Sequence, residues 1–336
     1  MRFLPTDEQR AFARSLDAML TAADTPTAVR AWAAGDPGPG RALWRGLGEA
    51  GVFALAVPEA YEGLGPRPVE LAHAFVESGR HAVPGPLVET VAAAALLAEL
   101  AGRGETGPAK RFLPGLVSGG TTASLVLAPD ALALDPDVAD ALFVVTGDEL
   151  RIAPGHTGIR VSADPVRRLA APAPGGELLA AGPAVAAAAV RARRWALLAT
   201  AAQALGVGLT LLDRTVAYAK QRTQFGAPIG SFQAVKHRLA DTLLGLEFAR
   251  PLLFGAALTF QEGDLAAAKA ACGEAAYAAA RGALQIHGAV GYTEELDLSL
   301  WLRKARPLRD AWGTPSWCRA RVLAELTTTA GSRGTG

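Results

Sequence analysis

Apolar positions in the first part of the chain recur every three or four residues, which is the period of an amphipathic α-helix. The stretch "PTDEQRAFARSLDAML" shows this period most clearly. Thr6 and Gln9 have the spacing of a capping box, and Phe12, Leu16 and Met19 share one face of the helix that follows. The sequence therefore predicts a capped helix that begins near residue 6.

The same period predicts more helices in the N-terminal third. One follows a Pro/Gly break, a second follows a Pro/Gly-rich connection, and a third is a run of alanine and leucine ended by a glycine. Their marker residues are Leu43, Trp44 and Leu47, then Val69, Leu71 and Phe75, then Gly102. The N-terminal third is therefore predicted to be helical.

The middle of the chain changes to short β-branched runs, which are typical of strands. Residues 121–129 form one such run, and residues 141–145 and 149–153 read as a hairpin joined across Gly147 and Asp148. "GIRVSADPVRRL" is a further candidate for a strand and a turn. The Pro/Gly-rich run "AAPAPGGELLAAGP" is predicted to be a linker.

From Ala184 onward the pattern is helical again, with Leu239, Leu243 and Leu246 at intervals of three and four residues. The order is therefore helices, a small β insert, and helices. We expect an N-terminal helical domain over residues 1–118, a reduced β domain with its linker over 119–183, and a C-terminal helical bundle over 184–330.

Composition and motifs argue against several classes of function. Of the 336 residues 50% are hydrophobic and 19% are charged, which is typical of a globular protein. The net charge of +1 gives no basic excess for a nucleic-acid partner or an anionic membrane. Cys272 and Cys318 are too few for a disulfide framework, and the five histidines form no metal-binding motif. No G-x-S-x-G elbow or P-loop supports hydrolysis or ATP chemistry. No metal is expected.

The start "MRFLPTDEQRAF" does not have the pattern of a secretory signal. The Ala-rich stretch around residues 180–210 is interrupted by "RARR" at 191–194, whereas a spanning helix needs about 20 apolar residues. We therefore expect a soluble, cytoplasmic protein without a membrane partner.

Two polar clusters stand out from this background. The first is "RTQFGAPIGSFQAVKHRLAD", residues 222–241. Arg222 and Gln224 flank a Phe225-Gly226 turn, and a guanidinium there could pair with a phosphate because its fork matches phosphate oxygens. The alternative is a helix C-terminus that is capped by the arginine and closed by a glycine turn.

The second cluster is "LQIHGAVGYTEELDLSLWLRKA", residues 284–305. Gln285, Gly288 and Gly291 would let the backbone approach a ligand closely, because glycine has no Cβ. His287 is either a proton carrier or, as is more common at a helix end, a capping or packing residue. The acids Glu294, Glu295 and Asp297 are interpreted as a solvated or salt-bridged helix start.

Taken together, these clusters resemble the acyl-CoA dehydrogenase family. "LAVPEAYEGLG" and "VELAHAFVESGR" resemble the N-terminal helical domain of the same family, so the likeness covers most of the chain in the expected order. It implies a mainly α fold with an N-terminal helical domain, a small β domain and a C-terminal four-helix bundle. It also implies FAD, an acyl-CoA substrate that is desaturated between its α and β carbons, and an acceptor similar to the electron-transfer flavoprotein. The helical bundles would pack together in a homo-oligomer or a hetero-oligomer.

The resemblance also implies roles for individual residues. In relatives the Arg-x-x-Phe-Gly turn and the Gln-x-x-Gly-x-x-Gly segment reach across a dimer interface to the ADP half of the neighbouring subunit's FAD. The positions that match here are Arg222, Gln224, Phe225, Gln233, Gln285, Gly288 and Gly291.

The catalytic positions of the family are not matched. Its glutamate base stands before a Gly-Thr pair in many relatives, where "LRDAWGTPSWCR" has Trp312, or on the helix before the Arg-x-x-Phe-Gly turn, where Ala196 falls by spacing. Neither side chain can abstract a proton. The polar run that packs on the flavin ring in relatives is also missing; "SLVLAPDALALDPD" is the nearest stretch.

This combination is similar to the short subunits of heteromeric members that degrade sterol side chains. The hypothesis is that this chain is such a subunit and that a full-length partner supplies the base and the flavin pocket. Two alternatives stay open. One is a self-sufficient dehydrogenase whose base is Glu247, Glu294 or Glu295. The other is a non-enzymatic assembly or CoA-ester-binding protein of the same fold.

Overall fold

The computed structural model describes residues 4–128 and 131–333. The chain divides into two compact units, and each is described by itself. One unit contains most of the N-terminal helices and the strands, as residues 12–74 and 83–196. The other consists of residues 1–11, 75–82 and 197–336 and contains the C-terminal helices. The expected three-domain boundaries stay a prediction.

The N-terminal helices lie where the apolar period predicts them. In α1 (Asp7–Ala22), the amide of Thr6 donates to Gln9 Oε1 at 2.9 Å and the amide of Gln9 donates to Thr6 Oγ1 at 3.2 Å, so the capping box is confirmed. Leu43, Trp44 and Leu47 are buried, as predicted. The remaining elements are α2 (Thr25–Ala33), α3 (Gly38–Glu49), η1 (Val52–Ala56), η2 (Glu59–Tyr61), α4 (Pro68–Arg80), α5 (Leu87–Gly102) and α6 (Thr106–Val117).

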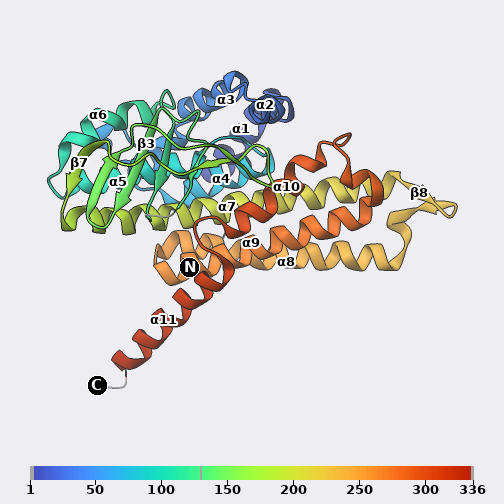
Figure 1. The fold of residues 1–336 in the computed structure, drawn as a ribbon. Helices are drawn as coiled ribbons and strands as arrows, with labels where there is room; N and C mark the ends of the chain where they lie inside the picture. The colour runs from blue at the N-terminus through green and yellow to red at the C-terminus, as the bar shows by residue number, and fades with distance from the viewer. Residues whose placement is uncertain (1–3, 129–130, 334–336) are drawn as a thin grey trace. The chain divides into compact units, whose positions relative to one another are not determined.

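The strands form two small sheets beside these helices (Figure 1). The four-stranded sheet has the order β1-β3-β4-β7, with β1 (Ala123–Val126), β3 (Ala141–Thr146), β4 (Glu149–Ile152) and β7 (Glu177–Ala181). The three-stranded sheet has the order β2-β6-β5, with β2 (Ala133–Leu134), β5 (Arg160–Val161) and β6 (Arg168–Ala170). The predicted hairpin is confirmed, because β3 and β4 pair antiparallel around Gly147, which has a φ of 62°.

One expectation about this region is wrong. Part of the run that was predicted to be a linker is strand β7, which pairs antiparallel with β4. The residues of β7 carry no pattern that marks a strand by themselves. They are ordered by the hydrogen bonds of the sheet edge, which the local sequence does not reveal.

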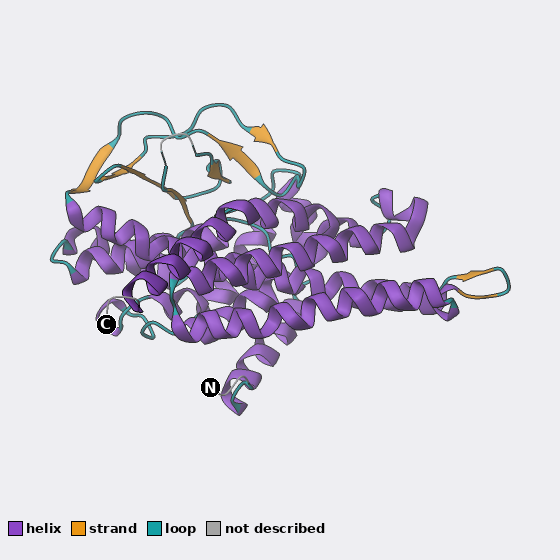
Figure 2. Cartoon of the chain, turned by 90° about the horizontal axis from the view of Figure 1, so that it is seen from below, coloured by secondary structure: helices purple, strands orange, loops and turns teal. Residues whose placement is uncertain are grey.

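The C-terminal helices are long, and the helical prediction from residue 184 is confirmed (Figure 2). Their order is α7 (Pro183–Gln221), the hairpin strands β8 (Thr223–Gln224) and β9 (Ala227–Pro228), η3 (Ile229–Ser231), α8 (Gln233–Thr259), α9 (Glu262–His287), η4 (Gly288–Tyr292), α10 (Leu298–Asp310) and α11 (Pro315–Arg333). At Gly208 of α7, a Cβ would lie 2.5 Å from Leu246 of α8 and 3.1 Å from Ala276 of α9. These three helices therefore pack closely.

Helices α7 and α8 are both long and apolar enough to cross a membrane by length and composition alone. This differs from the expectation, because the arginines at 191–194 interrupt only the first part of α7. In α7 the most apolar window is 94% buried, so the protein core accounts for its composition. In α8 the corresponding share is 28%. The exposed apolar side chains of α8 include Leu243, Leu244, Phe248, Leu252 and Leu258.

Candidate functional site

The first predicted cluster begins with a projecting hairpin between α7 and α8 and continues into the first turns of α8 (Figures 1 and 2). Helix α7 ends at Gln221, and the amide of Ile229 donates to Arg222 O at 2.8 Å across the hairpin. Phe225 and Gly226 form its tip with φ values of 52° and 78°. Two successive left-handed residues suit a tight hairpin turn, and the glycine makes the second one easy to adopt. The turn therefore belongs to a hairpin and is not a simple helix cap.

The side chains of this hairpin face solvent. Arg222 and Gln224 are exposed, and Phe225 is 94% exposed. The ring of Phe225 meets that of Phe232 edge-on, with 6.4 Å between the centroids. The guanidinium of Arg222 forms no ion pair with any other residue that the structure describes. The hairpin therefore presents an unpaired cation beside a bare aromatic ring.

The second predicted cluster spans the last turn of α9, η4 and the first part of α10. Gly288 has a φ of 62° with a ψ of −138°, and a Cβ added there would meet nothing within 4 Å. A Cβ at Gly291 would instead lie 3.1 Å from His287 Cβ and 3.2 Å from a methyl carbon of Leu284. Gly288 thus leaves open space beside its backbone, whereas Gly291 is needed for packing within the chain.

A ring stack joins the two clusters. Tyr218, one helical turn before Arg222, stacks on His287 with 4.1 Å between the centroids and 22° between the planes. His287 Nδ1 lies 2.8 Å from Ala283 O, which fits a proton on Nδ1, and burial lowers the pKa of His287. The geometry is that of a neutral packing residue. Only its position one helical turn before the motif could have pointed to Tyr218 from the sequence.

Gln285 lies at a groove between α8 and α9. It lines a hollow of about 470 Å³ together with Arg238, Arg281 and Tyr292. Gln233 is the first residue of α8 and is exposed. Among the residues that line this hollow, sequence patterns point to Gln285 but to neither arginine, because the way α8 faces α9 cannot be read from either helix alone.

Two hydrogen bonds from a buried lysine hold the loop that carries Trp312 in place. Trp312 and Gly313 have φ values of 58° and 149°. Lys269 is fully buried in α9, and its ammonium donates to Arg309 O at 2.5 Å and to Gly313 O at 2.8 Å. Burial lowers the pKa of Lys269 to about 8, and the neighbouring cysteine and aspartate groups oppose this shift. The loop offers backbone and indole at the position where the resemblance leads us to expect a carboxylate.

Ala196 and the three alternative acids also supply no recessed base. Ala196 is fully buried in α7. Glu247 pairs with Arg250 at 2.9 Å, Glu294 pairs with Arg303 at 2.5 Å, and Glu295 is exposed. Asp297 lies 3.9 Å from Arg214. The interpretation of the acids at 294–297 as a solvated and salt-bridged helix start is therefore confirmed.

The stretch nearest to the family's flavin-packing run, residues 124–137, contributes to its own unit. Residues 129 and 130 within it lie outside the described residues. Asp135 is fully buried; it accepts hydrogen bonds from Trp32 Nε1 at 3.2 Å and from the Arg168 amide at 2.8 Å. Burial raises the pKa of Asp135 to about 7, although the nearby Arg168 lowers it. This carboxyl serves to join α2 to the three-stranded sheet.

Comparison with known proteins decides the family. Residues 6–120 match the acyl-CoA dehydrogenase N-terminal domain, and residues 181–326 match the acyl-CoA dehydrogenase C-terminal domain. Acyl-CoA dehydrogenase IpdE2 of Mycobacterium tuberculosis is 34% identical over 96% of this chain and 98% of its own length. The chain belongs to the acyl-CoA dehydrogenase family. The resemblance inferred from the two clusters is thereby confirmed.

Solved acyl-CoA dehydrogenases share the fold. The structure named "Tcur3481-Tcur3483 steroid ACAD G363A variant" has a TM-score of 0.81 at 24% identity and covers 97% of this chain and 99% of its own. The ChsE4-ChsE5 complex from Mycobacterium tuberculosis has a TM-score of 0.79 at 24% identity, with 97% and 99% covered. The predicted fold class, mainly α with a small β region, is confirmed.

The cofactor of acyl-CoA dehydrogenases is FAD, as predicted. The residues of this chain fit one half of that cofactor. Arg222 is an unpaired exposed cation suited to a diphosphate, and Gly288 leaves room beside its backbone for close approach. The described residues at the family's base positions fit no proton transfer. Exposed, unpaired Arg222 and the open backbone at Gly288 therefore have the chemistry that a diphosphate contact needs, whereas Trp312 and Ala196 carry no acid.

Proposed function

We propose that this protein is the short, non-catalytic subunit of a heteromeric acyl-CoA dehydrogenase. It contributes contacts to the ADP half of an FAD whose flavin ring is held by a longer homologous subunit. One contrast supports the proposal: Arg222 and its hairpin are exposed and unpaired, whereas both base positions, Trp312 and Ala196, carry no acid. A chain that used its own flavin for its own reaction would need an acid at one of these two base positions.

Each predicted site residue has a specific part in this proposal. FAD, when bound, accepts the hydride that leaves the β carbon of the acyl-CoA. Arg222 pairs with the diphosphate, because a guanidinium matches phosphate oxygens. Gly288 allows close backbone approach, and Phe225 shields the contact from water. The amides contributing polar contacts are those of Gln224, Gln233 and Gln285, and Gly291 keeps the segment packed.

The partner and the substrate follow from the same proposal. The partner carries the glutamate base, and α8 offers it an apolar face that includes Leu244, Phe248 and Leu252. The neighbouring folds include a steroid acyl-CoA dehydrogenase and a two-protein complex, so the proposed substrate is the CoA thioester of a steroid fragment. Electrons pass to an acceptor similar to the electron-transfer flavoprotein, in the cytoplasm.

The test compares the chain alone with the chain co-expressed with a longer homologue that has an intact base. Flavin absorbance per protein and dehydrogenase turnover with an artificial acceptor are measured for both. We expect flavin and turnover only in the complex. Full flavin loading and turnover by the chain alone would contradict the proposal and favour the self-sufficient alternative. Gln substitutions of Glu247, Glu294 and Glu295 would then show which of them is the base.

A matched pair of variants tests the interface contact. Arg222→Ala is expected to weaken flavin retention by the complex about 30-fold, the usual effect of losing a charge-assisted hydrogen bond. Arg45→Ala removes another exposed arginine, on α3, and should leave retention unchanged. Equal retention in both variants would remove Arg222 from the cofactor contact. A complex that forms without any flavin would favour the non-enzymatic alternative.

A further inference from the structure

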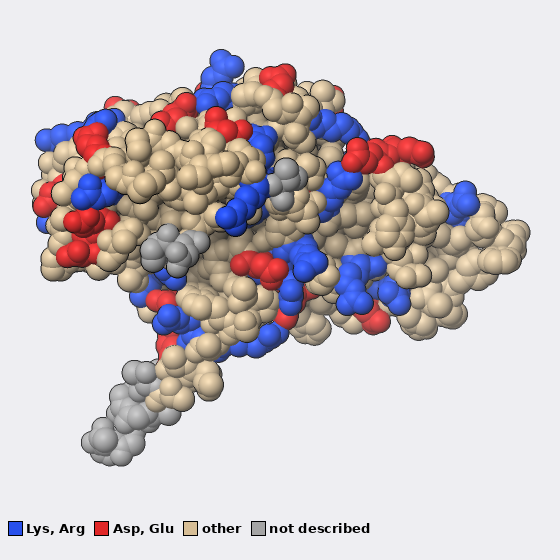
Figure 3. Space-filling view, viewed as in Figure 1, with Lys and Arg blue, Asp and Glu red and all other residues tan. Residues whose placement is uncertain are grey.

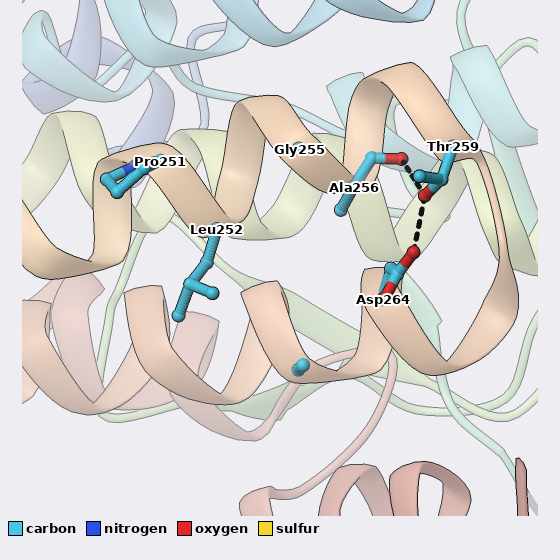
Figure 4. Close-up of a pocket in the computed structure, with 7 residues that line it drawn as sticks. Pro251, Leu252, Gly255, Ala256, Thr259 and Asp264 are labelled. Atoms are coloured by element: carbon cyan, nitrogen blue, oxygen red, sulfur yellow. Dashed lines mark hydrogen bonds between the residues drawn. The ribbon is translucent and has the colours of Figure 1, made fainter. Parts of the chain in front are cut away.

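The two connections that flank α9 are held in different ways. The α8–α9 turn is short and is fixed by a bond of its own, since the hydroxyl of Thr259 donates to Asp264 Oδ2 at 2.6 Å (Figure 4). The α9–α10 connection, residues 288–297, is longer. Within it the hydroxyl of Thr293 donates to Val290 O at 2.9 Å, and such a short-range bond fixes a turn without placing it against another helix. The position of the α9–α10 connection is therefore set by contacts with other elements.

The α9–α10 connection is acidic. Glu294, Glu295 and Asp297 lie within four residues, and in the space-filling view acidic side chains gather over the stretch that leads into α10 (Figure 3). Like charges at this spacing repel one another. Arg303 of α10 pairs with Glu294 at 2.5 Å, but α10 is continuous with the connection and cannot fasten it to the rest of the unit. A cation from a different helix can do so.

Helix α7 provides that cation as Arg214. The guanidinium carbon of Arg214 lies 4.2 Å from the centroid of the Trp301 ring, and its Nη1 lies 3.9 Å from Asp297 Oδ2. The attraction between a guanidinium and an indole face grows as both lose contact with water. Arg214 is partly buried and Trp301 is 2% exposed. Arg214 thus fastens the first turn of α10, and the end of the connection, to α7.

The ring of Trp301 is itself fixed. Its Nε1 donates to Arg80 O at 2.9 Å, and the hydroxyl of Thr210 on α7 donates to the same oxygen at 2.9 Å. The side chain of Arg80 pairs with Asp213 of α7 at 3.1 Å. All of these residues belong to the unit that contains the C-terminal helices. Arg214 therefore rests on a ring that the end of α4 and α7 hold in place.

The same face of α7 holds the other end of the connection. Tyr218 lies four residues after Arg214 and so shares its face of the helix. Tyr218 stacks on His287 with 4.1 Å between the centroids, and its hydroxyl donates to His287 O at 3.5 Å. Arg222 follows after four more residues, just beyond the end of α7. One stripe of α7 therefore holds the end of α9 and the start of α10, and it leads into the hairpin.

We propose that Arg214 is a positioning residue that sets the place of the α9–α10 connection, including Gly288, relative to the hairpin. It acts through Trp301 and Asp297 and contacts no cofactor itself. The effect on the connection is a property of the chain alone. The effect on flavin rests on the proposed function, in which Gly288 and the hairpin contact the same FAD.

Hydrogen exchange in the chain alone tests the first effect. Exchange at amides 288–300 is expected to rise about tenfold in Arg214→Gln, which removes the cation, and less than about threefold in Arg214→Lys, which keeps it. Arg306→Gln removes an exposed arginine of α10 and should change nothing. Wild-type exchange at 288–300 in Arg214→Gln, or an equal rise at residues 259–264 of the α8–α9 turn, would overturn the inference.

Flavin retention by the assembled complex tests the second effect. Arg214→Gln is expected to weaken retention about tenfold, Arg214→Lys should restore most of it, and the KM for acyl-CoA should stay unchanged. Full retention in Arg214→Gln, with flavin lost in Arg222→Ala, would overturn the inference and leave the proposed function standing. Flavin and turnover by the chain alone, with faster exchange at 288–300 in Arg214→Gln, would overturn the proposed function and support the positioning role.

Discussion

The C-terminal unit contains two regions that differ in how far the chain pairs its own polar and charged groups. At the hairpin and the α8–α9 groove, Arg222, Arg238 and Arg281 are exposed and have no ionic partner among the described residues. At the loop of Trp312, two backbone carbonyls are tied to the buried Lys269. The first region is open to a ligand, and the second is closed by the chain itself.

Under the proposed function, this difference separates a role that the chain performs from one that it leaves to a partner. An exposed guanidinium without an ionic partner in the chain is free to pair with a phosphate from outside it. The loop of Trp312 carries no carboxylate, and the hydrogen bonds from Lys269 hold its backbone in place. The β region resembles the loop of Trp312 in this respect, because its buried Asp135 is hydrogen-bonded within the chain, to Trp32 and to the backbone of Arg168.

The largest expected effect is on the pH dependence of the free energy of unfolding, and it tests the buried hydrogen bonds of Asp135 in the β region. Since the pKa of Asp135 is about 7 in the folded chain and 3.8 in the unfolded one, the folded state holds the proton more tightly. Its contribution to the free energy of unfolding is therefore fully present below pH 4 and falls by up to about 4 kcal/mol as the pH rises to 7. Denaturant titrations from pH 4 to 8 should show this slope in the wild type and lack it in Asp135→Asn. Asp148→Asn, at an exposed turn, should retain the slope, and identical slopes in all three proteins would contradict the assignment.

The next effect concerns the loop of Trp312. Lys269→Met leaves the carbonyls of Arg309 and Gly313 without their donor and should lower the free energy of unfolding by about 3 kcal/mol. Hydrogen exchange should rise at residues 309–316. Lys110→Met removes an exposed lysine on α6 and should change neither quantity. A Lys269→Met protein with wild-type exchange in this loop would show that the loop is closed by other contacts.

Lys269 also predicts a dependence on pH of opposite sign to that of Asp135. Its pKa is about 8 when folded and 10.5 when unfolded, so the unfolded chain keeps the proton longer. The free energy of unfolding should therefore rise as the pH rises from about 8 toward 10.5, and Lys269→Met should lack this rise.

A smaller effect, on flavin retention, is expected from the ring stack that joins the hairpin to the end of α9. Tyr218→Leu removes the stack on His287 and should weaken flavin retention by the complex about tenfold, because the hairpin and the end of α9 lose their shared support. The KM for acyl-CoA should be unchanged. Tyr61→Leu, in η2, serves as the control. Retention equal to the wild type would mean that the two motifs are positioned independently.

The last prediction is that a change at Trp312 leaves turnover unaffected. Trp312→Phe should leave the turnover of the complex, and its pH profile, within about twofold of the wild type, whereas loss of a general base costs about 10²–10⁴ in rate. A drop of tenfold or more, or a shifted pH profile, would give Trp312 a part in the chemistry and weaken the contrast between the two regions.

The sequence predicted features whose signals are local. The capping box of Thr6 and Gln9 and the turn at Gly147 depend on a few adjacent residues, and both form as expected. The groove could not be predicted, since Arg238 and Arg281 meet only because α8 packs on α9 in one register. Lys269 lies in a run of alanines that reads as an ordinary helix face. Its burial is decided by the distant loop at residues 309–313.

The apolar side of α8 has a consequence for the protein in a living cell. Only 28% of its most apolar stretch is buried, and Phe248 is 72% exposed. A newly made copy that finds nothing to cover this strip displays what chaperones and proteases recognise in damaged proteins. Synthesis of this chain in excess of whatever covers α8 should therefore end in its degradation, so that supply of the covering protein sets how much of it accumulates.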